Sequence, residues 1–87
     1  MSDLKSRFTA AAQDVQKLTT RPASDQLLEL YGLYKQSTDG DVKGSRPGFL
    51  DLTGRAKYDA WATKKGTTPD KAMQAYVDLV DHRLRKA

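Results

Sequence analysis

Apolar residues recur at three- and four-residue intervals along much of this chain, the spacing that places them on one face of a helix. The first such stripe predicts a helix from about Asp3 to Leu18, and its members are Leu4, Phe8, Ala11, Ala12, Val15 and Leu18. The polar segment 19–22 ends that helix. A second helix is expected to begin at Ser24, which can serve as its N-cap, and to end near Thr38.

Two further helices are expected in the second half of the chain. The third runs roughly from Thr53 to Lys65 and contains small residues that permit close approach of a neighbouring element. At Thr68-Pro69-Asp70, an N-cap, a first-turn proline and an early acid predict the start of a last helix that reaches the C-terminus. Its apolar stripe matches the first helix in period, so we expect the two to pack together; its members are Met73, Tyr76, Val77, Val80 and Leu84.

No segment reads convincingly as a strand, so the predicted fold class is all-α. We expect one four-helix domain over residues 1–87, with a long glycine-rich loop between the second and third helices. At 38% hydrophobic residues, such a domain has a modest core, and the absence of cysteine excludes disulfides and thiolate metal sites. The chain also lacks the apolar run of a signal peptide or membrane span, which favours a cytoplasmic protein without stable membrane insertion.

The second predicted helix carries the most informative side chains. Tyr31 and Lys35 stand four residues apart, so an aromatic ring and an ammonium group occupy adjacent turns of one face, with Tyr34 beside them. A flat ring next to a cation suits a nucleotide, and the net charge of +4 favours an anionic partner.

Catalytic and metal-binding functions have little support in the sequence. His82 is the only histidine and has no companion at ligand spacing, so we expect it to face solvent. Asp39 and Asp41 do not complete a calcium loop and are interpreted as turn residues. We therefore expect neither an enzyme nor a metal site.

The segment from Pro22 to Gly40 belongs to a longer pattern that includes Arg46-Pro47-Gly48, Lys57, Trp61, Lys65-Gly66-Thr67 and residues 72–76. This pattern resembles the acyl-CoA-binding proteins over almost the whole chain. The resemblance implies a four-helix bundle that holds the coenzyme A head in a surface bowl and shields the fatty acyl tail. It also implies a monomeric carrier that buffers medium- to long-chain acyl-CoA esters, catalyses nothing, needs no cofactor and exchanges ligand with acyl-CoA-producing and acyl-CoA-consuming enzymes.

Individual positions carry over from the family to this chain. Tyr31, Lys35 and Lys57 match residues that engage the 3′-phosphate, and Tyr34 and Tyr76 match aromatic residues at the adenine end. The positions that match the apolar wall and the close approach of the first helix are Leu27, Leu28, Ala56 and Ala12.

Adjacent leucines on a helix point in different directions, so one of Leu27 and Leu28 is expected to face the core and the other the groove. Trp61 is expected to pack between helices. Gln16 and Thr53 stand where relatives commonly have lysine, and Tyr58 stands where tryptophan is usual, so fewer cations are expected around the phosphates.

The sequence also bears on two other classes of function. Nucleic-acid binding is disfavoured because basic residues are interleaved with acids and no recognition helix stands out. A helical protein-interaction module remains the alternative, since an apolar groove between helices could also receive an amphipathic helix.

Overall fold

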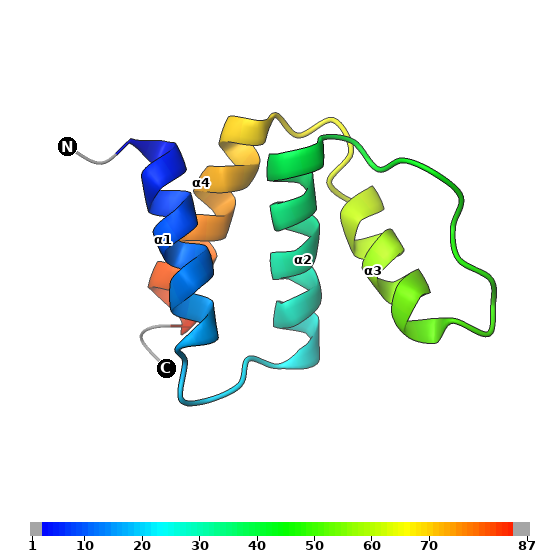
Figure 1. Ribbon diagram of the computed structural model, residues 1–87, viewed down its shortest axis with the longest axis horizontal. Helices are drawn as coiled ribbons and strands as arrows, with labels where there is room; N and C mark the ends of the chain where they lie inside the picture. The colour runs from blue at the N-terminus through cyan, green and yellow to red at the C-terminus, as the bar shows by residue number, and fades with distance from the viewer. Residues whose placement is uncertain (1–2, 85–87) are drawn as a thin grey trace.

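The computed structural model describes residues 3–84, and the all-α prediction is confirmed. Figure 1 shows α1, α2 and α4 grouped together, with α3 and the long loop before it on the far side of α2. The last helix continues into a π-helical turn. The elements are α1 (Leu4–Gln16), α2 (Ser24–Asp39), α3 (Leu52–Ala62), α4 (Pro69–Leu79) and the turn η1 (Val80–Leu84).

Helix α4 holds the bundle together, because it packs against both α1 and α2. The predicted packing of the first helix on the last is therefore confirmed. By contrast, no Cα atom of α1 comes within 8 Å of a Cα atom of α2, and α3 packs against α2 alone among the described helices. Helices α1 and α2 thus diverge from each other while sharing a partner.

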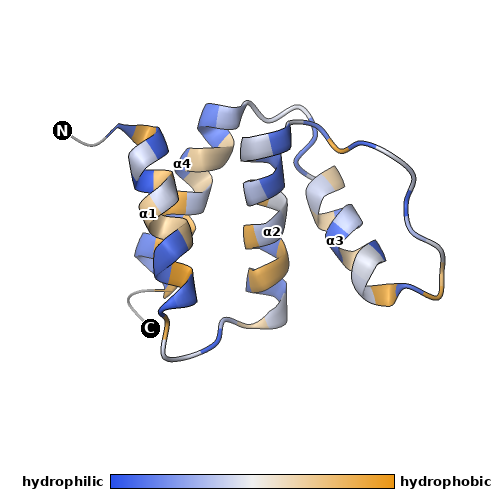
Figure 2. Cartoon of the chain, viewed as in Figure 1, coloured by the Kyte–Doolittle hydropathy of each residue, from blue (hydrophilic) through white to orange (hydrophobic). Residues whose placement is uncertain are grey.

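The hydrophobic core lies where α1, α2, α4 and η1 meet. It consists of Phe8, Ala11, Leu30, Leu33, Ala72, Tyr76, Val77, Val80 and Leu84. Figure 2 shows hydrophobic residues also at the start of α3, away from this core. There Phe49, Leu50 and Leu52 remain largely exposed. Helix α3 contributes no residue to the core cluster, and its buried side chain is Trp61.

Helix starts were predicted with mixed success. Thr68 caps α4 as expected, its side chain accepting a hydrogen bond from the Lys71 N–H at 3.2 Å. The expectation that Ser24 caps the second helix was wrong, because Ser24 already lies within α2 and the N-cap is Ala23. The Gln26 side chain reaches back instead and accepts a hydrogen bond from the Ala23 N–H at 3.1 Å, which satisfies one of the free donors at the helix start.

Helix ends were placed too late in two cases. Helix α1 ends at Gln16, and α3 ends at Ala62 rather than Lys65. After Ala62 the chain tightens into turns, with the Lys65 N–H donating to the Ala62 carbonyl three residues back at 3.2 Å. Asp39, which the sequence predicts to lie in a turn, is the last residue of α2. The predicted continuation of the last helix to the C-terminus falls partly on residues 85–87, outside the described range.

The long loop before α3 is fastened by polar contacts. The Trp61 indole N–H donates to the Gly40 carbonyl at 2.7 Å, and the Tyr58 hydroxyl donates to the Gly44 carbonyl at 2.9 Å. Arg46 forms a two-pronged ion pair with Asp59, with hydrogen bonds of 2.9 and 2.7 Å. The loop is therefore held to α3 at three separate points.

Asp41 fastens the same loop to its other neighbours. Its carboxylate accepts hydrogen bonds at 2.8 Å from the buried Gln36 amide and from the Gly66 N–H. The Gln36 amide also donates to the Thr67 carbonyl at 2.8 Å. One carboxylate thereby connects α2 to the segment that follows α3.

Candidate functional site

A cavity of about 370 Å³ opens where α1 and α2 diverge. Helix α1 contributes Ala12, Val15 and Gln16 to its lining, and the last helix contributes Tyr76. Helix α2 contributes four residues, which are Leu27, Leu30, Tyr31 and Tyr34. Apolar side chains and phenol rings therefore dominate the walls, as is usual for a site that binds an organic ligand.

Two of the lining rings, Tyr34 and Tyr76, form an aromatic cluster with Phe8. The centroid of Phe8 lies 5.1 Å from that of Tyr76 in an edge-on contact and 5.6 Å from that of Tyr34 in a stacked contact. Tyr76 is buried, and burial raises the pKa of its hydroxyl, whereas Tyr34 is 43% exposed. The cluster fixes the Tyr34 ring from behind and leaves part of it free to contact a ligand.

A lysine from α3 lies against one of the tyrosines that line the cavity. The Lys57 ammonium lies 5.6 Å from the centroid of the Tyr31 ring, which lines the cavity from α2. Attraction between the cation and the ring face holds the two side chains together. The fold therefore joins a tyrosine and a lysine that are far apart in the sequence.

Lys35 lies one turn after Tyr31 on α2, but its ammonium is already engaged. It forms an ion pair with Asp39 and lies 4.9 Å from the centroid of the Trp61 ring. The pKa of Lys35 is raised, chiefly by its hydrogen bond with Asp39. Lys35 is therefore charged, and its charge is partly compensated within the protein.

The approach of α3 to α2 depends on Gly32. A Cβ atom at this position would lie 2.6 Å from the carbonyl oxygen of Ala60, so only glycine fits here. Leu28 lies one turn before Gly32, and Ala56 lies one turn before Ala60. Leu28 and Ala56 thus flank the seam between α2 and α3, and Leu27 is the leucine that lines the cavity. The expectation that one of these two leucines faces the core was wrong, because neither belongs to the core cluster.

The structure sorts the predicted site residues into three groups. Five of them line one cavity: Ala12, Leu27, Tyr31, Tyr34 and Tyr76. The two lysines lie against aromatic rings, Lys57 at Tyr31 and Lys35 at Trp61. Leu28 and Ala56 are half-buried in the seam between α2 and α3.

Three neighbours of this site are not among the site residues predicted from the sequence. Val15 and Leu30 line the cavity, and Phe8 supports two of its tyrosines. All three belong to apolar helical stripes, and periodicity alone does not distinguish a cavity wall from a core position.

Two positions where the sequence departs from the family pattern have visible consequences. Gln16 lines the cavity, so a neutral amide stands at a wall where relatives commonly have an ammonium group. The Tyr58 hydroxyl is bonded to Gly44 in the loop and so serves the attachment of that loop. Thr53 is exposed at the start of α3.

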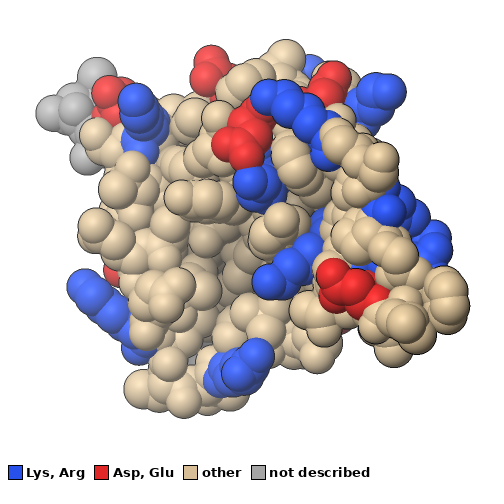
Figure 3. All heavy atoms as spheres, turned by 45° about the vertical axis from the view of Figure 1, so that its right-hand side comes forward, with Lys and Arg blue, Asp and Glu red and all other residues tan. Residues whose placement is uncertain are grey.

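Figure 3 shows lysine and arginine side chains around the middle of the face on which α2 and α3 come forward, and acidic atoms touch one of these cations near the top. Much of the surface between them is uncharged. A molecule with an anionic part and an uncharged part would find cations beside uncharged surface here.

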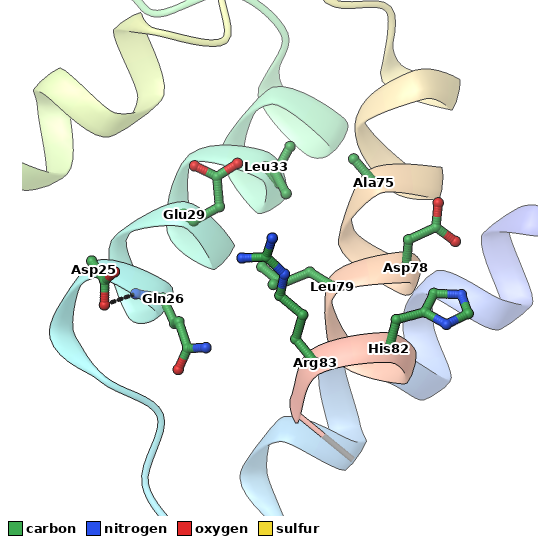
Figure 4. Close-up of a pocket in the computed structure, with 9 residues that line it drawn as sticks. All are labelled: Asp25, Gln26, Glu29, Leu33, Ala75, Asp78, Leu79, His82 and Arg83. Atoms are coloured by element: carbon green, nitrogen blue, oxygen red, sulfur yellow. Dashed lines mark hydrogen bonds between the residues drawn. The ribbon is translucent and has the colours of Figure 1, made fainter. Parts of the chain in front are cut away.

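A larger cavity of about 640 Å³ lies between α2 and the end of the last helix. Figure 4 shows Asp25 and Glu29 on one side and Asp78, His82 and Arg83 on the other. None of the predicted site residues lines it. Its lining includes three acidic residues and one arginine, and Glu29 is already paired with Lys64 at 2.6 Å, so the cavity presents no cluster of cations for a phosphorylated ligand. We therefore assign the candidate site to the cavity between α1 and α2.

Within residues 3–84, no group of three or more potential metal ligands gathers, and no helix is long and apolar enough to cross a bilayer. His82 is exposed, as expected. Trp61 is buried on α3, and its backbone nitrogen faces Gly32 of α2, which agrees with the expected packing role.

A family model and several solved structures match most of this chain. The family model described as "Acyl CoA binding protein" matches residues 5–80. Acyl-CoA-Binding Protein 2 of Oryza sativa is similar at 36% identity with a TM-score of 0.89, over 95% of this chain and 90% of that one. The ACBP from Moniliophthora perniciosa is similar at 39% identity with a TM-score of 0.82, over 99% of this chain and 90% of that one. Acyl Coenzyme A Binding Protein from yeast is similar at 42% identity with a TM-score of 0.71, over 91% of this chain and 92% of that one. The chain belongs to the acyl-CoA-binding protein family.

Proposed function

We propose that this protein binds medium- to long-chain fatty acyl-CoA esters non-covalently, as a single monomeric domain that carries and buffers them in the cytoplasm. It has no catalytic role and needs no cofactor beyond its ligand, which enzymes that make and consume acyl-CoA supply and remove. The observation that carries the proposal is that one cavity combines an apolar wall with tyrosine rings, and that a lysine from another helix lies against one of those rings.

The coenzyme A head is held at the tyrosine and lysine end of the site. A phosphate monoester is strongly hydrated, so it is retained only where several donors converge. The Tyr31 hydroxyl, Lys57 and Lys35 come from two helices that Gly32 brings together. Charge-assisted hydrogen bonds from such groups contribute about 1.5–3 kcal/mol each.

The adenine ring is a second anchor. Tyr34 is fixed by Phe8 and remains 43% exposed, so one flat surface is ready without further ordering. Stacking of a base on an aromatic side chain contributes about 1–3 kcal/mol. Tyr76, deeper in the same cluster, supports this platform.

The acyl chain lies against apolar walls. Leu27 and Ala12 line the cavity. We infer that the half-buried Leu28 and Ala56 extend this apolar surface along the seam of α2 and α3. Each buried methylene contributes about 0.8 kcal/mol, so a long chain can add on the order of 10 kcal/mol before the cost of ordering. We therefore expect affinity to rise from free coenzyme A to short-chain and then long-chain esters.

Calorimetric titration with coenzyme A, octanoyl-CoA and palmitoyl-CoA tests the proposal. Tyr31→Ala and Lys57→Ala should weaken binding of all three ligands by a similar factor, because both residues contact the shared head. Lys71→Ala, which removes an exposed lysine at the start of α4, is the matched control and should leave binding unchanged. Equal affinity for the three ligands would refute tail burial. No binding and no rise in melting temperature with palmitoyl-CoA would favour the interaction module instead.

A further inference from the structure

Asp39 stands directly beside the proposed head-group site. It is the last residue of α2, and its carboxylate pairs with the ammonium of Lys35 one turn earlier. The two side chains are 41% and 28% exposed, so the pair lies at the surface where a ligand can reach it. The positive charge of Lys35 is thus compensated before any ligand arrives.

Helix physics gives no structural reason for an acid at this position. A carboxylate at a helix C-terminus is disfavoured by the helix dipole, and a cation followed four residues later by an acid is the weaker orientation of such a pair. Gly40, with a φ of 83°, ends α2 through its own backbone and needs no help from Asp39. A residue that departs from local preference beside a binding site is a candidate for function.

The two lysines of the site therefore differ. Lys57 lies against the Tyr31 ring and takes part in none of the ion pairs within residues 3–84, whereas Lys35 is paired with the carboxylate of Asp39. An incoming phosphate can approach Lys57 without displacing a competing anion. At Lys35 the phosphate meets the Asp39 carboxylate, which already forms an ion pair with the ammonium group.

We propose that Asp39 is an internal competitor of the ligand's phosphate for Lys35, and that it lowers both the affinity for coenzyme A and the selectivity for its 3′-phosphate. This inference rests on the proposed function, because it takes Lys35 to be part of the head-group site. A phosphate must displace the carboxylate or accept its repulsion, and either event weakens binding.

Asp39 is ionised under physiological conditions. Its hydrogen bond with Lys35 holds the pKa of the carboxyl below the ordinary value of 3.8. The other charged or titratable groups around the pair are Lys43, which lowers this pKa further, and the hydroxyls of Tyr31 and Tyr34. The competing charge is therefore present throughout the neutral range.

The test compares Asp39→Asn with Asp78→Asn, which removes the same charge. Asp78 lies on α4, where it accepts a hydrogen bond from Gln74 at 2.9 Å, and it lines the other cavity. Each variant is titrated with coenzyme A and with dephospho-coenzyme A, which lacks the 3′-phosphate. We expect Asp39→Asn to bind coenzyme A about three- to tenfold more tightly than the unsubstituted protein does. Its affinity for dephospho-coenzyme A should stay within about twofold, as should both affinities of Asp78→Asn.

Lys35→Ala and the double variant Lys35→Ala/Asp39→Asn complete the cycle. Loss of the Asp39→Asn gain in the Lys35→Ala background supports competition. An equal gain in both backgrounds, or equal gains from Asp39→Asn and Asp78→Asn, overturns it and leaves general charge repulsion as the cause. If the unsubstituted protein binds neither coenzyme A nor palmitoyl-CoA, the proposed function itself fails. If it binds both and Asp39→Asn has no effect, only the present inference fails. Melting temperatures of all variants show that each is folded.

Discussion

The two sides of α2 are held in contrasting ways. On one side, α1, α4 and η1 meet α2 in an apolar core that includes Phe8, Leu33 and Val80. On the other side, α3 and its preceding loop contribute nothing to that core cluster. They are attached through polar contacts, the single buried side chain of Trp61 and the close approach at Gly32. Phe49, Leu50 and Leu52 even leave their apolar surface exposed there.

This difference matters for the site, because the site draws on both sides. The cavity and its aromatic wall belong to the apolar side, whereas Lys57 comes from the polar side. Apolar burial is strong and indifferent to direction, while hydrogen bonds contribute less but set orientation. The polar side therefore positions a cation that the apolar side cannot supply.

The largest effect should come from the apolar side. Leu33→Ala removes a nearly fully buried side chain, 4% exposed, and leaves a cavity between α2 and α4. We expect the free energy of unfolding to fall by about 2–5 kcal/mol, measured by denaturant titration. Affinity for palmitoyl-CoA should change little under conditions where the variant is folded. If the free energy of unfolding falls by less than about 1 kcal/mol, the apolar core is not the main source of stability on that side of α2.

The second-largest effect is expected at the contact between α2 and α3, where the two sides of the molecule meet. Gly32→Ala places a Cβ atom 2.6 Å from the Ala60 carbonyl oxygen, so α3 must move away from α2. We expect a loss of about 1–3 kcal/mol in unfolding free energy and weaker binding of coenzyme A, because Lys57 moves with α3. Gly48→Ala is the control, since an added Cβ there meets nothing within 4 Å. If Gly32→Ala keeps full affinity, the position of α3 does not set the site.

A smaller effect is expected from the polar attachment of the loop. Trp61→Phe keeps an aromatic ring but removes the hydrogen bond to the Gly40 carbonyl. The expected loss of unfolding free energy is about 1 kcal/mol. Hydrogen exchange should quicken in α3 and the loop while α1 and α4 keep their protection. Equal quickening throughout the chain would mean that the two sides do not differ in local stability.

The smallest effect should appear in acid. Hydrogen bonds from Gly66 and Gln36 lower the pKa of Asp41 below its ordinary value of 3.8, and Arg46 does the same for Asp59. Such carboxylates stabilise the fold fully above pH 3.8, and this contribution is lost as the pH falls through the lower, folded-state value. Melting temperatures measured from pH 6 downward should therefore drop below about pH 4. Asp41→Asn should make that drop in melting temperature smaller. If the melting temperature of Asp41→Asn depends on pH as that of the unsubstituted protein does, the Asp41 carboxylate does not stabilise the fold.

Much of the apolar side was predictable from the sequence. The stripes that begin at Leu4 and Met73 match in period, and the helices that carry them do pack together. Thr68 and Pro69 correctly predicted the start of α4, because helix capping depends on residues that are close together in the sequence. Errors arose where side-chain or turn contacts overrode local signals, as at Ala23, where Gln26 replaces the expected cap of Ser24.

The sequence by itself determined the all-α fold, the pattern of core positions and the family, because helical periodicity, capping and fixed residue spacing are written along the chain. Only the tertiary structure decided that Leu27 rather than Leu28 lines the cavity, that Lys57 meets Tyr31, and that Lys35 is paired with Asp39. The physical reason is that these outcomes depend on how far α1 and α2 diverge and how closely α3 approaches Gly32. Distances between helices are set by packing across the whole molecule, and no local stretch of sequence contains them.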